Sequence, residues 1–61
     1  MESKTRLLTE TGLSSRLNLS RRDVQAMVER NEIPFIRLPT GDIRFDEQAV
    51  QRWIEDLQAG R

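Results

Sequence analysis

Apolar residues follow a helical period in three stretches of this chain, and a period of two in the segment between the second and third stretches. The helical stretches follow Thr9, Ser20 and Asp46, whose side-chain oxygens can accept hydrogen bonds from free backbone N–H groups. Each cap has an apolar residue before it and another at the fourth helical position, the spacing of a hydrophobic staple. The pattern therefore predicts three capped helices with a hairpin between the last two.

The predicted helices end at residues that tolerate the left-handed backbone conformation. The first helix is expected from about Glu10 to Leu17, with Asn18 after it, and the second ends at Asn31. Gly60 ends the third. The turn between the first two helices is short, which forces a sharp crossing. The predicted apolar faces are Leu13 and Leu17; Val24, Met27 and Val28; and Ala49, Val50, Trp53, Ile54 and Leu57.

Residues 34–45 have the alternation and turn residues of a β-hairpin. Turn residues occupy positions 39–42, where Gly41 can adopt a positive φ. Pro34 and Pro39 lack the N–H group that a central strand needs, so we expect the hairpin to be an edge ribbon that is not part of a larger sheet.

The order of elements predicts a fold that is mainly α with a small β-hairpin: a winged helix-turn-helix. It has three helices, with a two-stranded wing between helices two and three. We expect this domain at residues 7–58, after a flexible N-terminal arm at residues 1–6 and before a C-terminal tail at residues 59–61.

Composition argues against catalysis and against metal or cofactor binding. The 61-residue chain has no cysteine, histidine or tyrosine, and it has no glycine-rich phosphate loop. A chain of this length has a thin core that must rely on packing and capping. Its apolar runs are too short for a membrane span or a signal peptide. The sequence therefore predicts a binding protein that is not an enzyme, with no metal, no cofactor and no small-molecule ligand.

Charge is balanced overall but unevenly distributed. Ten basic and ten acidic residues give a net charge of zero, which argues mildly against nucleic-acid binding. Residues 1–22 carry five basic against two acidic residues, a net charge of +3, and residues 23–61 carry five against eight, a net charge of −3. Nine of the ten basic residues are arginine, whose forked guanidinium suits phosphate and guanine.

The start of the second helix is the leading candidate DNA contact. Arg21 and Arg22 follow the Ser20 cap, although cations at a helix N-terminus oppose the helix dipole. Two such residues in succession suggest that they bind an anion outside the protein, such as a DNA phosphate. Gln25, one turn later, can bridge N6 and N7 of adenine. The alternative to DNA contact is that Arg21 and Arg22 are ordinary solvated residues of a first helical turn. Gln25 would then be a solvent-facing helix former.

The predicted wing supplies a second group of candidates. Arg37 and Arg44 can contact phosphates or the minor groove, with Thr40 and Gly41 at the tip. The alternative is ordinary polar alternation on an exposed ribbon. Further candidates for phosphate contacts are Arg6 and Arg16.

Three stretches carry a resemblance to a known family: "LLTETGLSSRLNLSRRDVQAMVERNEIP", "FIRLPTGDIRF" and "DEQAVQRWI". Over about residues 7–57 the chain resembles the excisionase-type (recombination directionality factor) branch of the MerR-like winged helix-turn-helix DNA-binding domains. Asp23 and Gln25 depart from the Thr and aromatic pair that is frequent there. The matching positions are Ser20, Arg21 and Arg22 at the start of the recognition helix, Glu32, Ile33 and Pro34 at its exit, Gly41 and Arg44 in the wing, and Trp53 and Ile54 in the closing helix.

The resemblance implies a phage-type excisionase that binds double-stranded DNA, bends attachment-site DNA and directs an integrase or recombinase toward excision. It also implies a cytoplasmic protein at the nucleoid of a prokaryotic host. The charge asymmetry predicts that copies bind tandem sites cooperatively, head to tail. Two alternatives remain: a small winged-helix transcriptional repressor or regulator, and a protein–protein interaction module, which the zero net charge favours.

Overall fold

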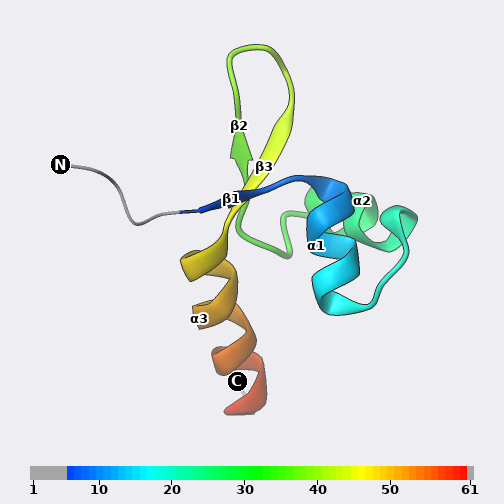
Figure 1. Ribbon diagram of the computed structural model, residues 1–61. Helices are drawn as coiled ribbons and strands as arrows, with labels where there is room; N and C mark the ends of the chain where they lie inside the picture. Colours follow the sequence, from blue (N-terminus) through cyan, green and yellow to red (C-terminus); the bar gives the residue numbers. More distant parts are fainter. Residues whose placement is uncertain (1–5, 61) are drawn as a thin grey trace, which may run out of the picture.

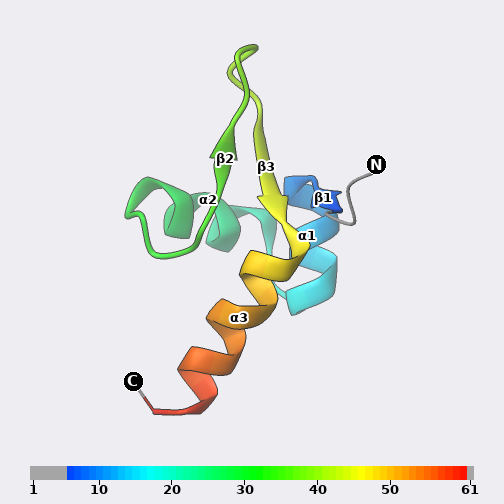
Figure 2. The same cartoon turned by 90° about the vertical axis from the view of Figure 1, so that its left-hand side faces the viewer.

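The computed structural model describes residues 6–60, and its three helices and antiparallel hairpin confirm the predicted fold class (Figure 1). The hairpin forms a wing that rises beyond the helices, and α3 runs away from the wing in the opposite direction (Figures 1 and 2). In chain order the elements are β1 (Leu7–Leu8), α1 (Glu10–Leu17), α2 (Arg21–Glu29), β2 (Ile36–Arg37), β3 (Ile43–Asp46) and α3 (Glu47–Gln58).

The three predicted helix caps are confirmed. In each, the side-chain oxygen accepts a hydrogen bond from a backbone N–H two or three residues later, at 3.0 Å for Thr9, 3.1 Å for Ser20 and 3.0 Å for Asp46. The predicted left-handed residues are confirmed as well, because φ is 59° at Asn18 and 56° at Asn31. These local features place the helix boundaries close to those the sequence predicts.

The prediction that the hairpin is not part of a larger sheet is wrong, because a third strand joins it. Both prolines lie outside β3, so the second edge of β3 can still pair. The sheet order is β1-β3-β2 with antiparallel pairing, and Leu8 lies opposite Phe45. The backbone N–H of Glu47 donates to the Arg6 carbonyl at 2.9 Å. The segment before α1 is therefore held against the start of α3. Apart from Arg6, the predicted arm lies outside the described residues.

The core takes one residue from each main part of the fold. Its buried side chains are Leu13 of α1, Val24 of α2, Ile33 of the loop after α2, Phe45 of β3 and Val50 of α3. Burying one such side chain contributes about 1.5–3 kcal/mol. This small core fixes α1, α2 and the base of the wing relative to one another.

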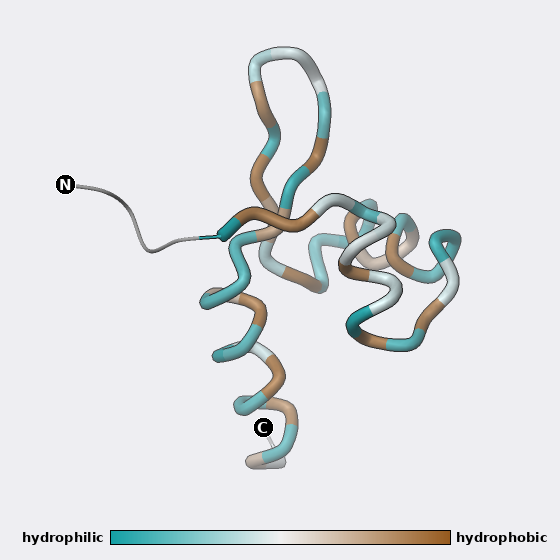
Figure 3. The backbone as a smooth tube through the Cα atoms, in the orientation of Figure 1, coloured by the Kyte–Doolittle hydropathy of each residue, from teal (hydrophilic) through white to brown (hydrophobic). Residues whose placement is uncertain are grey.

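The predicted apolar face of α3 is only partly used. Trp53 and Ile54 are half-buried and pack against the core, whereas Leu57 is 56% exposed. The helix extends beyond the rest of the domain (Figure 2), and the residues of its last turn, 55–58, are exposed. Hydrophobic stretches also extend up the wing beyond the helices (Figure 3).

Candidate nucleic-acid interface

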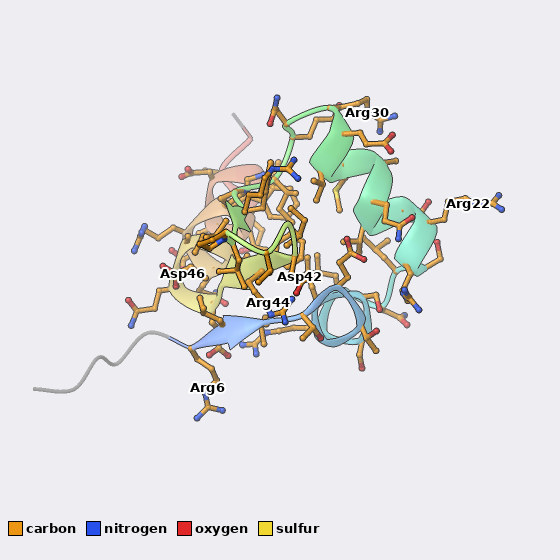
Figure 4. The ribbon with its side chains drawn as sticks, turned by 90° about the horizontal axis from the view of Figure 1, so that it is seen from above. Arg6, Arg22, Arg30, Asp42, Arg44 and Asp46 are labelled. Atoms are coloured by element: carbon orange, nitrogen blue, oxygen red, sulfur yellow. The ribbon has the colours of Figure 1, made fainter. Side chains whose placement is uncertain are left out.

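The N-terminal turn of α2 presents two arginines to solvent. Arg21 and Arg22 are exposed, and neither forms an ion pair with another described residue. Figure 4 shows Arg22 extending outward from the helix. The Ser20 oxygen caps the helix by accepting from the Asp23 N–H, which leaves its hydroxyl hydrogen able to donate to an anion. The predicted recognition-helix start is therefore accessible.

Gln25 is exposed one turn further along α2 and has a partner on α1. Its Nε2 donates to Oε1 of Glu10 at 3.3 Å. Sequence reasoning missed this contact because the two residues are 15 positions apart and belong to different helices. The bond links the first residue of α1 to a predicted base-contacting side chain.

A hollow of about 210 Å³ separates the exposed side of α2 from the wing. Its lining brings Arg37 of β2 close to Gln25 of α2. Two carboxylates also line it, so the hollow combines one cation with two anions. The lining residues are Glu10, Gln25, Val28, Glu29, Arg37 and Ile43.

The two wing arginines lie on opposite faces of the ribbon. In the β2–β3 register Arg37 is opposite Ile43, and Ile36 is opposite Arg44. Directly opposite residues share a face, and consecutive residues of a strand point to opposite faces. Arg37 therefore shares the side of Ile43 and the hollow. Arg44, which is partly buried, lies on the other side, and its Nη1 donates to the Ile43 carbonyl at 2.9 Å.

The wing tip is a closed turn with an acidic residue in it. The Leu38 N–H donates to the Asp42 carbonyl, and the Gly41 N–H donates to the Leu38 carbonyl, both at 2.8 Å. Gly41 has a φ of 97°, a conformation that a side chain would strain. The Thr40 hydroxyl donates to the Asp42 carboxylate at 3.2 Å. The predicted tip residues Thr40 and Gly41 are exposed, but Asp42 places a negative charge beside them.

Arg6 and Arg16, the other predicted phosphate contacts, both pair with Glu47 at the start of α3. Arg16 Nη1 contacts one carboxylate oxygen, and Arg6 Nε lies 3.9 Å from the other. Arg6 remains 78% exposed, while the Glu47 side chain is 27% exposed. The structure thus places these two arginines together, at the junction of β1, α1 and α3.

Metal-binding clusters and membrane-spanning helices are both absent from residues 6–60. No group of three or more His, Cys, Asp or Glu side chains is arranged to hold a metal ion. No helix in this part of the chain has the length and apolar character needed to cross a membrane.

The "Helix-turn-helix domain" family model matches residues 7–58, which cover all the helices and strands described above. No curated protein and no solved structure matches the chain. The family match agrees with the arrangement of α1, the short turn and α2. On this match the chain belongs to the helix-turn-helix domain family, whose domains are typically DNA-binding and non-enzymatic.

Proposed function

We propose that this chain is a sequence-specific double-stranded DNA-binding protein whose α2 enters the major groove with its N-terminal turn toward the bases. The observation that carries this proposal is the exposed pair Arg21 and Arg22 at the start of α2, beside a wing whose Arg37 lines the hollow next to that helix. The recognition helix and the wing therefore both carry exposed cations. The family match supports DNA as the partner.

Each side chain on α2 suits a different contact. An arginine can bind O6 and N7 of guanine in a bidentate manner or contact a phosphate, which is the proposed role of Arg21 and Arg22. Gln25 can contact adenine through its amide. The Ser20 hydroxyl can donate to a phosphate while its oxygen still caps the helix. Together these contacts would combine positioning on the backbone with reading of base edges.

The wing contributes cations on both of its faces. Arg37 lies on the side facing the hollow and Arg44 on the opposite side, so the ribbon can approach phosphates in two directions. The exposed tip at Thr40 and Gly41 allows the backbone to approach DNA closely. Arg6 and Arg16 would add phosphate contacts by sharing their guanidinium donors between Glu47 and DNA.

The excisionase role is the finer part of the proposal. It is supported by the sequence resemblance and by the uneven charge distribution. Glu55 and Asp56 are exposed near the end of α3, which extends away from the wing, so copies in one orientation can present unlike charges to each other. Tandem copies that follow the groove would bend the duplex, at a cost of about 1–6 kcal/mol. Such a protein would act at the nucleoid of a prokaryotic host and direct an integrase toward excision.

Footprinting on the DNA that flanks the chain's own gene, combined with a bending assay, tests this proposal. Adjacent direct repeats with bending support the excisionase role, whereas an isolated palindrome over a promoter would indicate a transcriptional regulator. The absence of any footprint would contradict DNA binding and favour a protein–protein module. The double variant Arg21→Ala/Arg22→Ala should abolish the footprint. Arg30→Ala, at the other end of α2, is the matched control because Arg30 pairs with Glu32 at 3.1 Å.

Assembly is tested by sedimentation without DNA, followed by titration of duplexes that hold one, two or three sites. A monomer in free solution and rising affinity per site support head-to-tail assembly on DNA. A stable dimer in free solution, or equal affinity per site on all three duplexes, would contradict it.

A further inference from the structure

The contact between Glu10 and Gln25 constrains a side chain that can otherwise present either of two hydrogen-bonding patterns. A glutamine amide has one acceptor oxygen and an NH₂ group with two donors, and a half-turn about its last bond exchanges their positions. An ionised carboxylate can only accept. Because Gln25 Nε2 lies 3.3 Å from Glu10 Oε1, the amide has its nitrogen toward Glu10, and the flipped amide would place two acceptors against each other.

This orientation has a consequence for base recognition. One N–H of Gln25 is directed to Glu10, so the amide oxygen and the second N–H remain available. Adenine offers a donor at N6 and an acceptor at N7 in the major groove, the complement of that pair. We propose that Glu10 is a positioning residue that fixes the amide of Gln25 and so gives it a preference for adenine. This inference rests on the proposed function of α2.

The surroundings of Glu10 are consistent with a residue that orients the exposed side chain of Gln25. Glu10 is partly buried, whereas Gln25 is exposed, so Glu10 has less conformational freedom than its partner. Glu10 is also the first residue of α1, where a negative charge is stabilised by the helix dipole. This stabilisation of the carboxylate does not depend on Gln25. Both residues line the hollow beside Arg37, where α2 and the wing approach each other.

A purely electrostatic role for Glu10 makes a different prediction. A carboxylate near DNA weakens binding to every sequence, because it opposes the phosphates. Its removal would then raise affinity uniformly and leave the base preferences unchanged. A positioning role predicts in addition that one base-pair preference is lost. Glu29 provides the matched control, because it is an exposed carboxylate that lines the same hollow.

The test measures the affinity of the full chain for a set of duplexes in which each base pair of its selected site is varied in turn. Glu10→Gln removes the charge and allows either amide orientation of Gln25. It should reduce the preference for adenine at one position by about fivefold or more, since a bidentate contact discriminates by about 1–3 kcal/mol. Glu29→Gln should leave all base preferences unchanged. In a Gln25→Ala background, Glu10→Gln should have no further effect on that position.

The outcomes separate this inference from the proposed function. If Glu10→Gln and Glu29→Gln raise affinity alike with every base preference retained, the positioning role is overturned while DNA reading by α2 stands. A parent chain without any base preference overturns both. Thermal unfolding of each variant checks the fold, and a Glu10→Gln variant that unfolds at the parent's temperature but loses the adenine preference supports the inference.

Discussion

Arg16 of α1 and Glu47, the first residue of α3, form an ion pair across 31 positions of sequence. The same carboxylate lies near Arg6, and the Glu47 backbone N–H donates to the Arg6 carbonyl. Glu47 therefore ties the segment before α1, α1 itself and α3 together. The two arginines that it contacts are also predicted phosphate contacts, so we expect Glu47 to influence both stability and DNA binding.

Replacing Glu47 should change these two properties in opposite directions. Glu47→Gln should lower the free energy of unfolding by about 0–1 kcal/mol per pair, because exposed ion pairs contribute little. It should raise affinity for random-sequence duplex, since Arg6 and Arg16 are released and a negative charge is removed. Urea unfolding and a DNA titration provide the two measurements. If Glu47→Gln lowers both the affinity for DNA and the free energy of unfolding, phosphate contacts by these two arginines are excluded.

Two leucines with different burial provide a matched test of the core. Leu13 is fully buried, and Leu13→Ala should lower the free energy of unfolding by about 2–5 kcal/mol. Leu57 is 56% exposed, and Leu57→Ala should change it by less than about 0.5 kcal/mol. Urea unfolding followed by circular dichroism measures both. Similar losses for the two variants would show that the end of α3 is packed in a way the structure does not describe.

The wing arginines should act through phosphates and not through bases. Arg37→Ala and Arg44→Ala should each weaken binding to specific and random DNA alike, and each should lower the salt slope of binding by about one unit. The double variant should lower it by about two units. Arg52→Ala, an exposed arginine of α3, serves as the control. An unchanged slope for either wing variant would place that arginine away from DNA.

Asp42 at the wing tip should oppose DNA binding. Asp42→Asn removes a negative charge next to Thr40 and should raise affinity for random duplex several-fold, most strongly at low salt. Asp56→Asn, at the far end of α3, should have a smaller effect. Equal effects of the two substitutions would mean that only net charge matters and that the wing tip does not approach the duplex.

Local signals predicted much of this fold. Thr9, Ser20 and Asp46 act as caps, and Asn18 and Asn31 adopt the left-handed conformation, because these preferences depend on a few neighbouring residues. Helix boundaries and the position of the hairpin follow from them. The start of α2 could likewise be identified, since its exposed arginines follow directly from the cap.

Pairing between distant segments could not be predicted in the same way. Strand β1 has two residues, too few to show a period, and it forms only because β3 offers a partner edge. Alternation within each wing strand does not say which faces match across the ribbon, and the register places Arg37 and Arg44 apart. Gln25 contacts Glu10 and Arg16 contacts Glu47, and in both pairs the two residues belong to different elements. Sequence spacing does not predict such contacts.

The most direct test of the central claim, that α2 reads DNA bases, is selection of binding sites from a random duplex library with the full chain and with Arg22→Ala. The parent should select a short motif that includes a guanine. Arg22→Ala should lose preference at one or two base pairs, at a cost of about 1–3 kcal/mol for a bidentate contact, and keep the rest of the motif. Selection of no motif by the parent, or of the same motif with the same strength by both proteins, would contradict the claim.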